Sequence, residues 1–422
     1  MLTFAPTTPF AHVSPEDWLD PQWQMKNCLE SKEDFAAHFT LSAEEELAFA
    51  QLHELFRIRV TPYYASLVNP SDPLDPIRRI LMPHSLELDS GPYILEDPLG
   101  ERRHRPVERI VHRYPDRVLF LVTDFCSVYC RYCTRKHFTG QDQVFPKREE
   151  YVQALEYIKS HSSIREVILS GGDPLTLSDS RLDQVLSDLR QIPHVEIIRI
   201  GSRIPVVNPM RITEELVQII RRSSPVFFLV HFNHPRELTA EAAQALGLLV
   251  DHGIPVMNQM VLLNGVNNHP AIVQALSRRL LYLRVKPYYM FQCDPSEGTR
   301  HLQTSVEQSE DIQRELWGRL SGLALPNLSL DIPGGGGKVS LVPDFEVGRQ
   351  GVTRTYRGWD GFGSEYVSPD LQEMLTPSDV DQYIAEWNTI RHAPYGLPKN
   401  RRSPHDAESA NSRSKGQSPL EC

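Results

Sequence analysis

The clearest pattern in the chain is an alternation, from Val118 onward, of short apolar runs with amphipathic segments. The apolar runs have the length of strands and are VLFLVTD, EVILS, VEIIRI, VFFLVH, IPVMNQMVL and LRVKPYYMFQ. Helix-patterned segments such as EEYVQALEYIKS and AEAAQALGLLVDHG separate them. Nearly continuous apolar strands indicate a parallel sheet that is buried on both faces. Six such strand-then-helix units, about thirty residues each, predict an α/β fold built on a partial (β/α)6 barrel.

The chain on either side of these units has a different pattern. Before them, Pro-rich stretches accompany one predicted helix, SAEEELAFAQLHELFRI, in which Ser42 and Glu45 have the spacing of a capping box. From Lys399 the chain lacks aromatic and β-branched residues, which is typical of disorder. The sequence thus predicts an N-terminal helical and extended region (1–110), the barrel (111–295), a C-terminal region (296–395) and a disordered tail (396–422).

Composition and charge exclude several classes of partner. The 422 residues include 44 basic and 54 acidic side chains with a formal net charge of −10, and no basic stripe, so nucleic acid is not an expected partner. The apolar runs are strand-sized and the start MLTFAPTTPF lacks the features of a targeting segment, which predicts a cytoplasmic protein with no membrane partner. Half of the six cysteines fall in one short window, which favours metal ligation over a disulfide framework.

That window, CSVYCRYC, places Cys126, Cys130 and Cys133 directly after the first apolar run. A structural zinc or a complete iron–sulfur site needs four protein ligands, so three cysteines leave one metal position open for a small molecule. The other cysteines of the chain are Cys28, Cys293 and Cys422. The alternatives are that one of these closes the site, or that three core cysteines gather by chance.

Further unusual motifs fall where the next predicted strands end. They are SGGD, which is Ser170, Gly171, Gly172 and Asp173, then GSR at 201–203 and HFNHP at 231–235. Because the carboxyl ends of barrel strands carry the chemistry of such folds, these motifs predict one shared cavity. Two glycines at a strand end let backbone groups approach a ligand, although a tight turn would show the same pair.

A second glycine motif lies further along, where LSLDIPGGGGKVSLVP places Lys338 after four consecutive glycines. Such a run costs backbone entropy and indicates backbone that is packed closely against something. A phosphate loop is disfavoured because the spacing is wrong, Val339 follows the lysine, and a strand pattern follows in place of a helix. A lysine beside a closely packed ligand suits a Schiff base, and the alternative is a flexible turn with a solvated lysine.

Taken together, these motifs resemble the lysine 2,3-aminomutase family of radical S-adenosylmethionine enzymes. The segments that carry the resemblance are HRYPDR, CSVYCRYCTRK, RIGSRIPVV, HFNHP, RVKPYYMFQCD and DIPGGGGK, within a span from about Trp18 to Pro369. The resemblance implies a radical-SAM barrel, a [4Fe–4S] cluster on the three cysteines, and S-adenosylmethionine on the open iron and on SGGD. It also implies pyridoxal 5'-phosphate on Lys338, with its phosphate near Arg113, Tyr114 and Arg117.

The resemblance further implies residues that hold the two ends of a substrate. Arg135 matches the family arginine that grips the substrate carboxylate, and Asp294 and Asp331 match the two aspartates that hold the ε-ammonium of lysine. Two carboxylates suit an ammonium group and would repel the side chain of glutamate. The expected reaction is the isomerisation of L-lysine to L-β-lysine, (3S)-3,6-diaminohexanoate.

Four alternatives stay open from the sequence. The same chemistry could act on arginine or on glutamate, or supply β-lysine for modification of a translation factor. A different class is a non-catalytic iron–sulfur redox sensor.

Zinc-containing members of the family have a cysteine where Asn267 and Asn268 stand here, and residues 340–421 contain no cysteine, so we expect no structural zinc. An electron donor such as flavodoxin or ferredoxin is implied, and a homo-oligomer is open.

Overall fold

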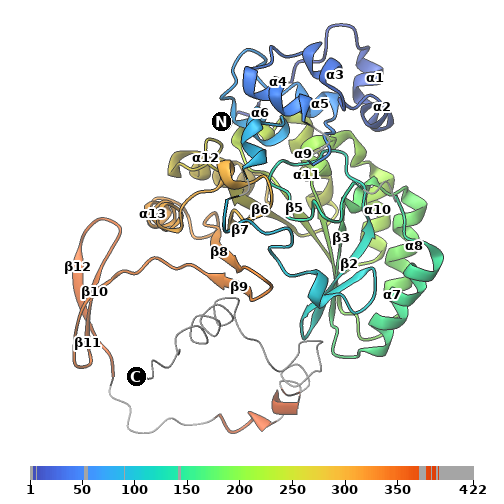
Figure 1. Cartoon of the computed structure of the whole chain (residues 1–422). Helices are drawn as coiled ribbons and strands as arrows, with labels where there is room; N and C mark the ends of the chain where they lie inside the picture. Colours follow the sequence, from blue (N-terminus) through green and yellow to red (C-terminus); the bar gives the residue numbers. More distant parts are fainter. Residues whose placement is uncertain are drawn as a thin grey trace, which may run out of the picture.

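A mixed sheet of nine strands curls into a nearly closed barrel in the computed structural model (Figure 1). The structure describes residues 3–5, 7–51, 56–89, 91–140, 144–369, 377–381, 383–385 and 388. The strands are β1 (Ile110–Tyr114), β2 (Arg117–Thr123), β3 (Glu166–Gly171), β4 (Ile197–Ser202), β5 (Val226–Val230), β6 (Val256–Leu262), β7 (Lys286–Gln292), β8 (Asn327–Ile332) and β9 (Gly337–Ser340). Neighbours from β2 to β8 pair in parallel, whereas β1 and β9 pair antiparallel at the two ends.

Helices follow the parallel strands in turn and cover the outside of the sheet. They are α7 (Arg148–Ser160), α8 (Asp179–Arg190), α10 (Glu214–Arg222), α11 (Ala240–Asp251), α12 (Pro270–Tyr282) and α13 (Val306–Leu316). Each buries one apolar stripe against the strands, as Leu182, Leu186 and Leu189 do in α8, and polar N-caps such as Ser178 begin them. The predicted partial (β/α)6 barrel is therefore confirmed, and β1, β8 and β9 extend its sheet. The sheet crosses the boundary that the sequence placed after residue 295.

Short helices precede the barrel and gather over one end of it (Figure 1). They are α1 (Pro15–Leu19), α2 (Pro21–Lys26), α3 (Lys32–Ala36), α4 (Ala43–Ala50), α5 (Pro62–Ala65) and α6 (Pro76–Leu81). The capping box of Ser42 and Glu45 is present at α4. The helix ends at Ala50, however, and the expected extension to Ile58 is wrong, because residues 56–58 are not helical. Just after them, Val60 pairs through its backbone with Leu29, a tertiary contact that competes with the helix.

The remaining elements are single turns and a small separate sheet. The turns are α9 (Ile204–Val207), η2 (Ser85–Leu88), η3 (Arg102–His104), η4 (Pro174–Thr176), η5 (Pro209–Arg211), η6 (Pro235–Glu237) and η7 (Arg300–Leu302). The small sheet is antiparallel, projects away from the barrel (Figure 1), and consists of β10 (Glu346–Gln350), β11 (Thr353–Arg357) and β12 (Gly363–Val367). The predicted tail 396–422 lies outside the described residues. Within the described ranges, no helix is long and apolar enough to cross a bilayer.

Candidate active site

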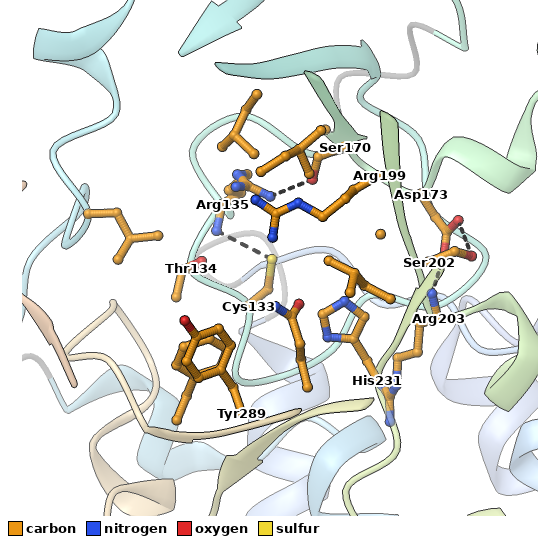
Figure 2. A pocket seen from close by; sticks show the side chains of 18 of the residues that line it. Cys133, Thr134, Arg135, Ser170, Asp173, Arg199, Ser202, Arg203, His231 and Tyr289 are labelled. Atoms are coloured by element: carbon orange, nitrogen blue, oxygen red, sulfur yellow. Dashed lines mark hydrogen bonds between the residues drawn. The ribbon is translucent and has the colours of Figure 1, made fainter. Parts of the chain in front are cut away.

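The inside of the barrel holds a cavity of about 740 Å³ that the predicted site residues line. Its walls come from strands β1 to β9 and from the loops at their carboxyl ends. The site residues that line it are Arg113, Tyr114, Arg117, Cys126, Cys130, Cys133, Arg135, Ser170, Gly171, Gly172, Asp173, Asp294, Asp331 and Lys338. Figure 2 shows Arg135, Arg199 and His231 directed into the same space. The structure thus brings together every residue that the sequence analysis assigned to the site.

The three cysteines lie on the loop that leaves β2, and buried partners hold this loop. Arg131, between the second and third cysteines, forms an ion pair with Glu87 at 2.5 Å, and both side chains are inaccessible to solvent. Arg131 also donates to the backbone oxygens of Phe56 and Arg57. The N-terminal region therefore fixes the cysteine loop from outside the barrel.

The cysteine loop fits an iron–sulfur cluster. The thiols of Cys126, Cys130 and Cys133 are free and partly buried. Burial raises the pKa of Cys126 and of Cys133, and the neighbouring thiols raise both further. Positively charged iron would stabilise the thiolate form of these cysteines and offset the repulsion between them. Within the described ranges, no three His, Cys, Asp or Glu side chains are arranged around a single metal ion. A cluster places each cysteine on a different iron and so asks for a wider arrangement.

The other cysteines do not complete the site. Cys28 donates to the backbone oxygen of Gln24, and Cys293 is buried beside Asp294; neither thiol lines the cavity. Cys422 lies outside the described residues. Within the described part of the chain, only the triplet therefore presents thiols to the cavity.

The SGGD motif joins the end of β3 to the cysteine loop. A Cβ at Gly172 would overlap the backbone carbonyl of Phe125, and the amide of Gly172 donates to the oxygen of Thr123 at 2.7 Å. Asp173 accepts hydrogen bonds from the Ser202 hydroxyl and the Arg203 amide, both at 2.7 Å (Figure 2). The glycines are thus required first by the close approach of the cysteine loop, a reason that the sequence did not reveal.

Arg135 follows the cysteine loop and is held by two partners. Its Nε lies 2.9 and 3.0 Å from the two carboxylate oxygens of Glu101, and its Nη2 lies 2.8 Å from the first of them. Its Nη1 donates to the Ser170 hydroxyl at 2.9 Å (Figure 2). The guanidinium group is therefore oriented within the cavity before any ligand is considered.

Lys338 lies in β9, opposite Asp331 in the register of the β8–β9 hairpin. Its Nζ is 3.2 Å from an oxygen of Asp331, and its backbone amide donates to the Tyr114 hydroxyl at 3.0 Å. Arg113 donates to the other oxygen of Asp331 at 2.9 Å. These contacts join β1 to the β8–β9 hairpin, so side chains of the predicted site bridge the seam of the barrel. The guanidinium group of Arg117 stacks on the Tyr114 ring, 3.9 Å from its centroid.

The two aspartates influence each other through the cavity. The pKa of Asp294 is raised to about 7, chiefly by burial and then by the negative charge of Asp331, while Lys338 and Arg113 act to lower it. A carboxylate in such surroundings is stabilised by a cation placed beside it.

Sequence reasoning missed roles for three residues. Glu101 pairs with Arg135, as described above. Arg203, from the GSR motif, donates to the Cys130 sulfur at 2.7 Å and to Glu237 at 2.8 Å. His231, from HFNHP, is neutral because burial and two nearby arginines lower its pKa to about 4. Arg203 and His231 belong to motifs at strand ends, so their position could have marked them; Glu101 carries no local signal.

A barrel of this kind with three cysteines after its first parallel strand defines a radical S-adenosylmethionine enzyme, and the Radical SAM superfamily model matches residues 120–274. The Lysine-2,3-aminomutase model matches residues 313–396. L-lysine 2,3-aminomutase of Clostridium subterminale is 44% identical over 360 residues, which cover 85% of this chain and 86% of that protein. Glutamate 2,3-aminomutase of Clostridioides difficile is 38% identical over 346 residues, which cover 82% of each.

The chain therefore belongs to the lysine 2,3-aminomutase family and is an isomerase. The resemblance inferred from the motifs is confirmed. Family membership implies a [4Fe–4S] cluster and S-adenosylmethionine, and the free thiols at the cavity fit the cluster.

Proposed function

We propose that this enzyme converts L-lysine to L-β-lysine, (3S)-3,6-diaminohexanoate, with pyridoxal 5'-phosphate on Lys338 in addition to the cluster and S-adenosylmethionine. The observation that carries the proposal is that one cavity presents both a pair of carboxylates, Asp294 and Asp331, and an oriented guanidinium group on Arg135. Lysine carries the complementary groups, a distal ammonium and an α-carboxylate.

The carboxylate pair supports a cationic substrate side chain. Asp331 is buried, and Asp294 has a pKa raised by burial and by Asp331. An ammonium group between them would offset the repulsion, whereas a third carboxylate would increase it. Glutamate, the substrate named for the C. difficile relative, is for this reason disfavoured here, although it belongs to the same reaction class.

The residues around Lys338 fit pyridoxal phosphate. An aldehyde cofactor with a phosphate needs an amine, cationic groups and hydroxyl donors, and Lys338, Arg113, Arg117 and Tyr114 all line the same cavity. When bound, the cluster with S-adenosylmethionine supplies removal and return of a hydrogen atom, and pyridoxal phosphate holds the amine that moves between neighbouring carbons.

The chain's own contribution is to hold and orient the reacting groups. Arg135 would fix the carboxylate, Asp294 and Asp331 the distal ammonium, and Lys338 would provide the amine that binds the cofactor. Ser170, Gly171, Gly172 and Asp173 would lie beside S-adenosylmethionine. Orientation of this kind supplies a large share of catalysis when the reaction itself needs little acid–base work.

The test is an anaerobic assay of the reconstituted, reduced protein with S-adenosylmethionine and pyridoxal phosphate. Lysine, arginine, glutamate and alanine are offered separately and β-amino acids are detected by mass. We expect β-lysine from lysine alone. Borohydride reduction followed by peptide mass spectrometry should place the pyridoxal group on Lys338.

Other results would replace the proposal. A β-amino acid from arginine alone would refute the lysine assignment, and one from glutamate or alanine alone would also refute the role of the aspartate pair; in each case the amine migration itself would stand. No product from any substrate, with the cluster intact, would favour the redox sensor. A cytoplasmic location, a flavodoxin or ferredoxin as electron donor, a homo-oligomer and the lack of a structural zinc remain part of the proposal. So does any supply of β-lysine to a translation factor.

A further inference from the structure

A short turn outside the barrel, residues 97–104, contacts both halves of the site. The side chain of Asp97 accepts hydrogen bonds from the amides of Glu101 and Arg102, each at 2.9 Å, and its backbone oxygen accepts from Gly100. The turn is thus fixed by its own first residue. We call it the 97–104 turn.

The 97–104 turn packs against the glycine run before Lys338. The amide of Gly334 donates to the oxygen of Pro98 at 2.8 Å. Gly100 has a φ of +62°, and a Cβ there would lie 2.8 Å from the carbonyl of Gly334. A Cβ at Gly335 would lie 2.7 Å from the ring of His104. The glycines therefore allow this turn to approach the hairpin that carries Lys338.

From the same turn, Glu101 reaches across to Arg135. The Glu101 side chain is only 4% exposed, and it takes the Nε and Nη2 side of the guanidinium group. A guanidinium group has five N–H donors. Glu101 and Ser170 engage one donor on each of the three nitrogens, so one N–H of Nη1 and one N–H of Nη2 remain. Donors from these two nitrogens can bind a carboxylate.

We propose that Glu101 is a positioning residue that sets the orientation of Arg135 for the substrate carboxylate. The inference rests on the proposed function, in which Arg135 binds that carboxylate. Glu101 holds the guanidinium plane from one side and ties it to the turn that packs on the Lys338 hairpin. The position of the carboxylate site is thereby coupled to the position of the cofactor lysine.

Removal of Glu101 would leave Arg135 close to two sulfurs of the cysteine loop. Cys126 and Cys133 interact electrostatically with Arg135, and the Arg135 amide donates to the Cys133 sulfur at 3.4 Å. A guanidinium group released from Glu101 would keep only its Ser170 contact and would no longer be held in one orientation for the substrate carboxylate. A positioning role for Glu101 therefore predicts that its removal weakens the binding of ligands that carry a carboxylate and leaves the binding of other ligands unchanged.

The experiment compares amino acids with the amines that lack their carboxylate. Calorimetric titration under anaerobic conditions uses the reconstituted enzyme with pyridoxal phosphate and S-adenosylmethionine but no reductant, so that no turnover occurs. The pairs are lysine and cadaverine, arginine and agmatine, glutamate and 4-aminobutyrate, and alanine and ethylamine. The variants are Glu101→Ala and Glu101→Gln, with Glu96→Gln as the matched control because Glu96 pairs with Arg102 at the surface.

For the amino acid that the unmodified enzyme binds best, we expect Glu101→Ala to weaken binding by about tenfold or more. The reason is that Arg135 would no longer be oriented to donate its charged hydrogen bond to the ligand carboxylate. Glu101→Gln keeps one acceptor and should weaken it less. Binding of the matching amine and all binding by Glu96→Gln should be unchanged. Iron and pyridoxal phosphate contents, measured in parallel, establish that the site is intact.

The outcomes separate this inference from the proposed function. If the best ligand is an amino acid other than lysine, the lysine assignment fails while Glu101 is still tested on that ligand. An equal loss for amino acid and amine, or no loss in either Glu101 variant, would overturn the positioning role. If the unmodified enzyme binds no amino acid of the panel, both the function and the inference are overturned.

Discussion

Asp294 carries a carboxyl group whose protonation the cavity controls. Its pKa is raised to about 7 by burial and by Asp331, and Glu101 adds a smaller contribution in the same direction. The cations that oppose the rise are Lys338 and Arg113. Because the pKa lies above its ordinary value, the proton stays bound in weakly acidic solution and leaves as the pH rises through about 7.

Lysine binding should therefore strengthen with rising pH. The ε-ammonium of lysine stays charged throughout and favours the ionised carboxylate, so affinity should increase by about tenfold between about pH 6 and pH 8. Asp294→Asn should bind lysine more weakly and lose most of this rise. Calorimetric titration at a series of pH values measures both, and an unchanged pH profile in Asp294→Asn would contradict the assignment.

At the scale of elements, the end of β3 and the cysteine loop form one packed unit. Gly172 and Asp173 donate backbone hydrogen bonds to Thr123 and Phe125, and no side chain could stand at Gly172. The cluster ligands are thus positioned by a strand that carries none of them.

We expect Gly172→Ala to displace the cysteine loop. Overpacking of this kind costs about 1–3 kcal/mol, and the reconstituted protein should bind less iron per chain. Gly247→Ala in α11 is the matched control, because a Cβ there meets nothing within 4 Å. It should keep the iron content and stabilise the helix by up to about 1 kcal/mol. Iron analysis and thermal unfolding report the two effects, and full iron loading in Gly172→Ala would argue against the packing.

At the scale of the whole molecule, the N-terminal region is part of the active-site framework. The Arg131–Glu87 ion pair joins it to the cysteine loop, and Tyr64 of α5 donates to Glu237 and accepts from Arg203, which reaches Cys130. These residues come from segments that lie far apart along the chain. The N-terminal region and the cysteine loop should therefore fold and unfold together.

Arg131→Met should test this coupling. It leaves the buried Glu87 without its cation, which costs about 3–5 kcal/mol. Iron binding should fall with stability, although Arg131 is not a ligand. Arg165→Met removes an exposed ion pair with Glu196 and should change stability by less than about 1 kcal/mol. Chemical denaturation with iron analysis distinguishes them; equal effects in the two variants would refute a special role for the buried pair.

The sequence alone was enough to predict the barrel and many of the residues that line its cavity. Strand length, apolar runs and helix stripes are local properties, so they predicted the six parallel strands from β2 to β7. Motifs at strand ends converge in any parallel barrel, and for this reason Cys126 and Asp173 were expected at one cavity before their positions were known. Lys338 was added to that site by the family resemblance of its motif.

The tertiary structure decided which side chains meet within that cavity. Arg113 and Asp331 are 218 residues apart and meet only because β1 and β8 approach each other at the barrel seam. Glu101 lies in a segment without periodic pattern and becomes significant only through its contact with Arg135. The sequence placed Ile58 in a helix, whereas the structure pairs the nearby Val60 with Leu29, a partner far back in the chain. Local sequence fixes backbone preference, but contacts between distant segments depend on how the whole chain closes, because each requires a partner that no local pattern specifies.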